Sequence, residues 1–251
     1  MKIIVTAGPT REYLDPVRFL SNPSTGKMGF AVAAEAARRG HDVTLIAGPV
    51  ALKTPKGVKR VDVVSAREML EAVVEALAHA TGMSRPLCCD APRRRDIPVA
   101  FVSTAAVADW RPAKCATSKI KKHQMSGTLR LVRNPDILKT IARKVGVASW
   151  SSRSVDAQSA FPLQPPPPTP TYLIGFAAET DNVLGEASRK CRKKGLSFIV
   201  ANDVSEKGSG FGTDTNRVTF VFPDGTLKRH PLMSKRRVAG AIIREIEGLA
   251  R

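Results

Sequence analysis

The sequence predicts an α/β protein with a Rossmann-like, three-layer fold and a mostly parallel sheet. Short apolar runs alternate with segments of helical period over about the first 200 residues, and this alternation is typical of parallel sheets covered by helices on both faces. The pattern changes near the C-terminus, where two runs flank Asp224-Gly225, a turn typical of hairpins. The hairpin is expected to add either an antiparallel edge or a small subdomain.

The strands are predicted from short apolar runs that end at turn residues. In chain order they are Lys2–Val5, Val43–Ala47, Val99–Thr104, Leu173–Ile174, Phe198–Ala201, and the two hairpin arms Arg217–Phe222 and Thr226–His230.

The helices are predicted from their period and their end signals. Ser65-x-x-Glu68 is a capping box, and Asn134-Pro135 places an N-cap residue before a proline at the first helical position. The predicted helices are Lys27–Arg39, one that starts at Ser65, one that starts at Asn134, Asn182–Lys194, and Lys235–Leu249.

We expect residues 1–251 to form a single domain. Two stretches, 81–98 and 145–170, have no period, and the second is rich in Ser, Gln and Pro. Both are predicted to be loop insertions.

The composition narrows the class of partner. The net charge of +18 is explained first by general surface charge, then by a site for small polyanions, and last by a nucleic-acid surface. Aromatic residues make up only 5% of the chain, and no nucleic-acid motif is present, so no nucleic acid is expected. The four cysteines form no C-x-x-C pair, and no apolar stretch approaches the length of a membrane span. We expect a cytoplasmic protein with no membrane association.

The loop that follows the first strand is a candidate anion site. It ends in Ser24-Thr25-Gly26 at a helix start, where backbone N–H groups and the helix dipole favour negative charge. A plain capping loop explains the same residues. The segment matches neither a P-loop nor G-x-G-x-x-G, which argues against ordinary NAD binding.

Three further segments carry candidate ligand contacts. Small residues from Ala105 precede Asp109, which is suited to a metal ion or a hydroxyl group, and Lys119–Lys122 is either a lid over phosphates or a solvated charge run. Phe176, in Gly175–Thr180, is suited to stacking on a base or to packing in the core. Lys190 and Lys194 lie four residues apart on one predicted helix face, so both can approach one triphosphate.

In this order the motifs resemble phosphopantothenoylcysteine synthetase, the ligase domain of the bacterial bifunctional coenzyme A biosynthesis flavoprotein. The matching segments are Val5–Gly29, Ala105–Lys122, Asn134–Leu138, Gly175–Thr180 and Ala201–Asn216. The resemblance implies a phosphopantothenate–cysteine ligase (EC 6.3.2.5). CTP activates the carboxylate of 4′-phosphopantothenate as an acyl-cytidylate and pyrophosphate leaves. The amine of L-cysteine then forms the amide and releases CMP.

The resemblance also implies the site residues. Lys119 would stabilise the α-phosphate, Asn22 would bind the acyl-cytidylate, and Arg18 lies in the same loop. Asp109 would hold Mg²⁺ with the triphosphate, and no flavin is expected. The implied nucleotide-binding residues are Ser103, Thr104, Ala105, Asp109, Lys119, Pro135, Asp136, Ile137, Leu138, Phe176, Lys190 and Lys194. A homodimer is implied, with Asn202–Ser205 and the late hairpin in its dimerisation subdomain.

Several alternatives stay open. The flavin-dependent decarboxylase half is absent from this sequence and is expected, if present, on a separate chain or on the rest of a longer protein. Ser118 stands where glutamate is common in the family. A nucleotide-binding homologue impaired by its insertions, an ATP-using version of the ligase, a Rossmann-type oxidoreductase and a basic nucleic-acid-binding protein remain the competing hypotheses.

Overall fold

The computed structural model describes the chain except for residues 83–96, 123–126, 147–168, 207 and 211. The predicted insertions at 81–98 and 145–170 therefore lie mostly outside the described residues. Among those described, no helix combines the length and the apolar character needed to cross a membrane.

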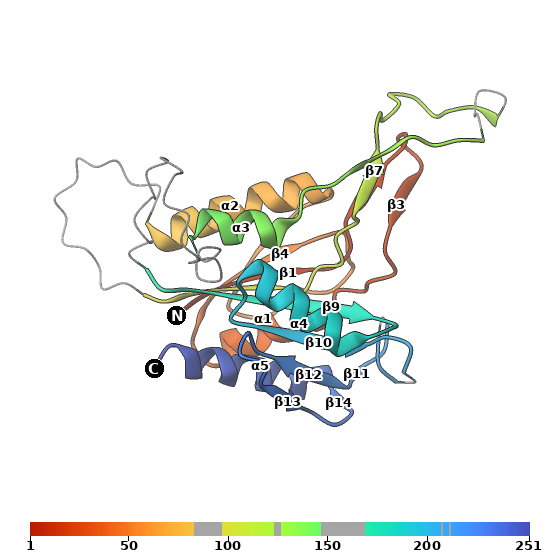
Figure 1. The fold of residues 1–251 in the computed structure, drawn as a ribbon. Coiled ribbons are helices and arrows are strands. Elements are labelled where there is room, and N and C mark those ends of the chain that lie inside the picture. The colour runs from red at the N-terminus through yellow and green to blue at the C-terminus, as the bar shows by residue number, and fades with distance from the viewer. Residues whose placement is uncertain (83–96, 123–126, 147–168, 207, 211) are drawn as a thin grey trace, which may run out of the picture.

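The centre of the molecule is an eight-stranded sheet in the order β13-β12-β10-β9-β6-β1-β4-β5 (Figure 1). Six strands are mutually parallel, β12 is antiparallel to its neighbour β10, and β13 is antiparallel to β12. This mostly parallel sheet confirms the predicted α/β class. The strands are β1 (Lys2–Ala7), β4 (Asp42–Ala47), β5 (Val58–Asp62), β6 (Val99–Ser103), β9 (Thr171–Glu179), β10 (Phe198–Asp203), β12 (Val218–Val221) and β13 (Leu227–Arg229).

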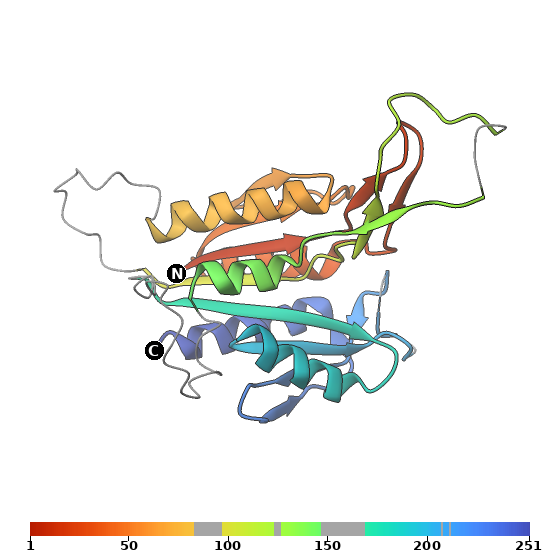
Figure 2. The same ribbon diagram turned by 45° about the horizontal axis from the view of Figure 1, so that its top comes forward.

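In the described residues, five helices cover the two faces of the sheet, as Figure 2 illustrates. α1 (Lys27–Arg38) and α5 (Lys235–Leu249) pack on one face, and α2 (Ala66–Thr81), α3 (Ile137–Lys144) and α4 (Val183–Lys194) pack on the other. Successive side chains of a strand point to opposite faces of the sheet, so the core is divided into two halves. Ile3 and Val5 of β1 face α1 and α5, while Ile4 faces α2.

The starts of α2 and α3 test the two capping signals found in the sequence. The predicted N-cap at Ser65 is confirmed, since the Ser65 hydroxyl accepts the Glu68 N–H at 3.2 Å; the Glu68 carboxylate reaches back one residue further than in a standard capping box, to the Val64 N–H at 2.9 Å. The prediction for Asn134-Pro135 is wrong. The N-cap of α3 is Asp136, whose carboxylate accepts the Lys139 N–H at 3.0 Å.

The late hairpin does not form a separate subdomain. β12 pairs with β10, so the hairpin extends the main sheet at one edge. Three small two-stranded sheets lie outside it: β2 (Arg11–Tyr13) with β3 (Phe19–Ser21), β7 (Trp110–Pro112) with β8 (Leu131–Arg133), and β11 (Thr215–Asn216) with β14 (Met233–Ser234). The β2–β3 and β7–β8 hairpins stand side by side and project from the body (Figures 1 and 2).

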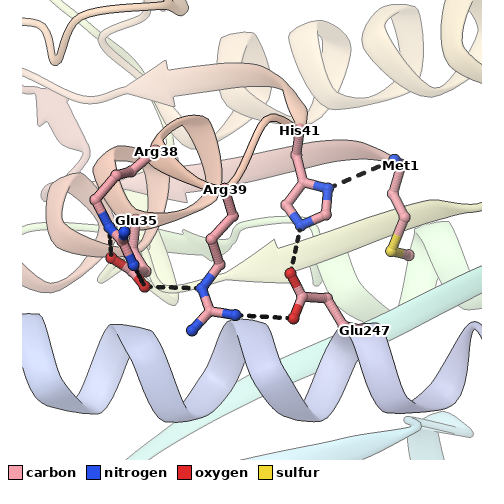
Figure 3. Close-up of polar contacts among 6 residues, drawn as sticks. All are labelled: Met1, Glu35, Arg38, Arg39, His41 and Glu247. Carbon is pink, nitrogen blue, oxygen red and sulfur yellow. Dashed lines mark hydrogen bonds and ion pairs between the residues drawn. The ribbon is translucent and has the colours of Figure 1, made fainter.

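A polar network ties the ends of α1 and α5 together (Figure 3). Arg39 bridges Glu35, at 2.8 Å, and Glu247, at 2.9 Å, and His41 lies 3.0 Å from Glu247. Glu35 is buried and also accepts two bonds from Arg38 at 2.8 Å. Hydrogen bonds from Arg38, opposed by burial and reinforced by Arg39, lower the pKa of Glu35 to about 2.

Candidate active site at the switch point of the sheet

The chain order places a crevice between β1 and β6. From β1 the chain builds outward through β4 and β5, and it then crosses to β6, β9 and β10 on the other side. The point of reversal lies between β1 and β6, and in open α/β sheets ligands bind beyond the carboxyl ends of the strands at that point.

The loops that follow these two strands are joined to each other. Pro9 and Ala106 form a parallel bridge. The Ala106 N–H donates to the Gly8 carbonyl at 3.0 Å, and the Thr10 N–H donates to the Ala106 carbonyl at 3.4 Å. The two loops therefore form one short continuation of the sheet and give a ligand a fixed backbone surface.

Three of the predicted nucleotide-binding residues lie at this junction. Ser103 pairs in register with Thr6, and the Thr104 hydroxyl donates to the Thr6 carbonyl at 2.6 Å. The Ala105 N–H approaches the Thr6 hydroxyl at 3.4 Å. Asn22 joins the same group, since its side-chain amide donates to the Ala106 carbonyl at 3.0 Å.

A cavity of about 120 Å³ opens where these loops meet α1. Its wall is formed by Ser24–Gly29, Thr104–Ala106 and Phe176–Ala178, and by Asn202, Gly210, Asn216 and Lys235. Thr104, Ala105 and Phe176, three of the predicted nucleotide-binding residues, thus line one cavity, and their role in binding a nucleotide stays a prediction.

The first turn of α1 supplies an anion-binding element to the cavity. Gly26 precedes the helix in the left-handed region, with φ 77°, and makes no side-chain cap bond. The N–H groups of a first helical turn have no partners within the helix, and together with the helix dipole they favour an anion. The Lys27 ammonium adds a cation beside this turn, held 2.7 Å from the Asp214 carboxylate.

Lys235 is a cavity residue that the sequence did not indicate. Its side chain is buried and its ammonium donates to the carbonyls of Gly210, at 3.0 Å, and Thr213, at 2.6 Å. Burial and the nearby Lys27 cation lower its pKa, and Asp214 opposes that shift. Lys235 thus fixes the loop before β11 against the start of α5.

Two asparagines complete this wall. The side-chain oxygen of Asn202 accepts the Ser209 hydroxyl at 2.6 Å, and that of Asn216 accepts the Gly210 N–H at 3.1 Å. Asn202 lies one residue before the end of the central strand β10 and lines the cavity. That Asn202–Ser205 belongs to a dimerisation subdomain stays a prediction.

The glycine before Phe176 has a packing role. A Cβ on Gly175 would lie 2.7 Å from Leu196 Cδ1 and 3.3 Å from Leu138 Cδ1. Gly175 therefore admits these two leucines on the α3–α4 face, while Phe176 points to the opposite face and the cavity.

The predicted phosphate contacts on α4 each pair with a carboxylate from a different element. Lys190 pairs with Glu179 at the end of β9, and Lys194 lies 2.8 Å from Asp136 at the start of α3. Burial raises the pKa of Asp136, but bonds from Lys194 and the Lys139 N–H outweigh it, so the net shift is downward.

The remaining residues before α3 have structural partners. Asn134 donates its side-chain amide to the Ala108 carbonyl at 2.8 Å and accepts from Arg111 at 3.0 Å. This use at the base of the β7–β8 hairpin explains why Asn134 does not cap α3. Pro135 precedes the helix, whose first residues Ile137 and Leu138 pack into the α2–α4 core.

Asp109 is exposed, and its backbone carbonyl accepts the Asn134 N–H at 2.8 Å. Among the described residues no group of three or more His, Cys, Asp or Glu side chains is placed to hold a metal ion. One exposed carboxylate nevertheless fits Mg²⁺, which usually binds proteins through one or two carboxylates and takes its other ligands from substrate phosphates and water.

Arg18 and Lys119 lie on the projecting hairpins. Arg18, in the turn of the β2–β3 hairpin, pairs with Asp15 and donates to the Ile120 carbonyl at 2.9 Å. Lys119 is exposed in the segment between β7 and β8 that stands away from the body (Figure 2). The structure thus connects Arg18 to the segment that carries Lys119.

Comparison with known proteins assigns the family. Residues 1–84, 88–150 and 165–249 match the family described as the DNA/pantothenate metabolism flavoprotein C-terminal domain. The chain belongs to that family. The two breaks in the match fall within the predicted insertions.

Relatives agree with this assignment. The chain is 43% identical over 249 residues to the coenzyme A biosynthesis bifunctional protein CoaBC of Escherichia coli K12, with 98% of this chain and 51% of that protein covered. It is 42% identical over 230 residues to CoaBC of Vibrio parahaemolyticus, with 90% and 47% covered. The chain therefore spans about half the length of these curated relatives.

A solved structure of the C-terminal domain of CoaBC superposes with a TM-score of 0.69 and 35% identity, covering 99% of this chain and 95% of that one. The resemblance recognised from the motifs is thus confirmed at the level of the family and the fold.

Proposed function

We propose that this chain is the ligase that joins 4′-phosphopantothenate to L-cysteine in coenzyme A biosynthesis, with CTP as the activating nucleotide. The observation that carries the proposal is the cavity at the switch point, which combines a helix N-terminus, backbone loops and Phe176 at one place. Membership of the family whose relatives are named for coenzyme A biosynthesis supports the same reaction.

In the first step, a carboxylate oxygen of 4′-phosphopantothenate attacks the α-phosphorus of CTP, and the bond to pyrophosphate breaks. Negative charge builds up on the α-phosphate, so cations aimed at it lower the barrier. Lys119 would supply this charge, Lys190 and Lys194 would bind the phosphates in place of Glu179 and Asp136, and Phe176 would contact the base. Mg²⁺ held by Asp109 would neutralise charge on the triphosphate.

In the second step, the amine of cysteine attacks the acyl carbon, the C–O bond to CMP breaks, and the amine loses a proton. Asn22 would hold the acyl-cytidylate during this exchange, because its side chain is fixed against Ala106 beside the cavity. Positioning of the two reactants supplies much of the rate.

A homodimer is part of the proposal, with the projecting hairpins as its contact surface. They carry five of the exposed large apolar side chains, between 39% and 57% exposed: Val17, Phe19, Trp110, Leu129 and Leu131. Exposed apolar groups gathered on one projection are typical of protein interfaces. We expect Val17→Glu with Leu131→Glu to give a monomer in sedimentation velocity, whereas Leu227→Glu, on the edge strand β13, should remain dimeric.

The chemistry is tested by omitting cysteine. With CTP, Mg²⁺ and 4′-phosphopantothenate, we expect one equivalent of pyrophosphate per site and an acyl-cytidylate detectable by mass spectrometry, and added cysteine should restart turnover. Pyrophosphate release with ATP and none with CTP would replace the nucleotide assignment. Binding of CTP without release of pyrophosphate would identify an impaired homologue.

A further inference from the structure

Asp15 is a fully buried carboxylate in the turn of the β2–β3 hairpin, although its neighbours Pro16 and Val17 are exposed. One oxygen, Oδ1, accepts the N–H groups of Val17 and Arg18, both at 2.9 Å. These two bonds close the turn and are explained by local structure.

The second oxygen of Asp15 bonds outside the turn. Oδ2 accepts from the Arg18 guanidinium, with Nε at 3.1 Å, and from the Ile120 N–H at 3.2 Å. Arg18 in turn donates to the Ile120 carbonyl at 2.9 Å. Both backbone groups of Ile120 are therefore held by one ion pair that lies about a hundred residues earlier in the chain.

A second contact holds the same segment to the same hairpin, because the Ala116 N–H donates to the Leu14 carbonyl at 2.8 Å. Lys119 lies between these two attachments and is joined by one peptide unit to Ile120. Its own side chain is exposed, so its backbone, rather than its packing, determines where the ammonium begins.

We propose that Asp15 is a positioning residue of the ligase reaction: it orients Arg18 and fixes Ile120, and it thereby sets the place from which Lys119 reaches the α-phosphate. The inference rests on the proposed function for its kinetic consequence, but the contact between Asp15 and Ile120 has a structural consequence of its own. The hydrogen bond from Arg18, opposed by burial and helped by three backbone N–H groups, holds the pKa of Asp15 well below its usual range. The Asp15 carboxylate therefore stays charged at the near-neutral pH of the enzyme assays.

The test compares Asp15→Asn with Glu35→Gln. Asparagine keeps the size of the side chain but turns an NH₂ group toward one of the N–H donors. Glu35→Gln is the matched control, because Glu35 is also buried and bonded to arginines, Arg38 and Arg39, but at the far end of α1. We expect Asp15→Asn to lower kcat for pyrophosphate release about 10- to 100-fold, as for a displacement near 1 Å, with the KM for cysteine unchanged.

Limited trypsin digestion supplies a readout that does not depend on activity. Cleavage after Lys119 is expected to be several times faster in Asp15→Asn than in wild type, whereas Glu35→Gln should lower the melting temperature without changing this cleavage or the kinetics. If Asp15→Asn does not fold, Ile120→Pro removes the same N–H donor. Because trypsin does not cleave a Lys–Pro bond, the readouts for this variant are cleavage after Lys121, which is expected to be faster than in wild type, and kcat, which is expected to fall as in Asp15→Asn.

Wild-type cleavage and wild-type kcat in Asp15→Asn would overturn the proposal. Equal kinetic losses in Asp15→Asn and Glu35→Gln would overturn it too, because they would reflect stability alone. A wild-type chain that releases no pyrophosphate would instead refute the ligase function, and the trypsin comparison would still decide whether Asp15 holds the segment.

Discussion

Gly29, in the first turn of α1, is a position beside the cavity where adding one methyl group should have a large effect. A Cβ at this position would lie 2.5 Å from the Ala7 Cβ, 3.1 Å from the Ala7 Cα and 2.4 Å from the Thr104 hydroxyl oxygen. Carbon atoms in contact normally lie about 3.5–4.0 Å apart. The start of α1 would therefore have to move away from β1 and β6 by about 1 Å.

The expected effect of Gly29→Ala combines two opposing terms. Alanine in a helix is favoured over glycine by about 1 kcal/mol, and overpacking a tight contact costs about 1–3 kcal/mol. Gly248→Ala isolates the first term, because Gly248 is an exposed residue of α5 and its Cβ would meet no atom within 4 Å. We expect Gly29→Ala to unfold in urea with a free energy lower than that of Gly248→Ala by about 1–3 kcal/mol.

Activity should respond more strongly than stability. A 1 Å shift of the helix start displaces the N–H groups that line the cavity, and such a displacement typically costs about 100-fold in rate. Pyrophosphate release and CTP binding by Gly29→Ala and Gly248→Ala would be measured side by side. The close contact of α1 with β1 and β6 would be refuted if both variants were equally stable and equally active.

The remaining predictions concern buried groups. Because the folded pKa of Glu35 is depressed to about 2 from 4.5, its stabilisation is complete above pH 4.5 and is lost as the pH falls toward 2. Glu35→Gln should therefore lower the free energy of unfolding by about 2 kcal/mol at pH 7, and by less at pH 3; an equal difference at both pH values would contradict this. Burial raises the pKa of the Cys191 thiol to about 11, so peptide mapping after thiol labelling at pH 8 should find Cys115 modified and Cys191 unmodified until urea unfolds the chain. Rapid labelling of Cys191 in the native protein would show that α4 opens.

The parts of the fold that sequence analysis located correctly are those with strong local signals. α5 was predicted at its observed bounds from the helical spacing of its apolar residues, and the structure adds that Ser234 caps it. The strand β5 was not predicted. It is an edge strand in which Lys59 and Arg60 interrupt the apolar run, so its pairing depends on its neighbour β4 rather than on its own composition.

For the candidate site, sequence analysis found some of the residues that line the cavity and missed others. Thr104 and Ala105 follow β6, and Phe176 lies within β9. The resemblance implied all three, and they lie at one cavity because the carboxyl ends of parallel strands meet at one edge of the sheet. Lys235 is about 200 residues from the first loop of the cavity, and only the packing of α5 beside α1 brings it there. Asn134 shows the opposite failure, because a good local cap signal was overridden by a tertiary hydrogen bond to Ala108.

The most direct test of the central claim is steady-state pyrophosphate release by the purified chain with 4′-phosphopantothenate, L-cysteine, Mg²⁺ and either CTP or ATP, beside the variant Lys119→Gln. The account predicts release that requires CTP and 4′-phosphopantothenate and that falls at least about 100-fold in the variant, the loss expected for removing one charge that stabilises the transition state. No release with either nucleotide from a folded wild-type chain would contradict it.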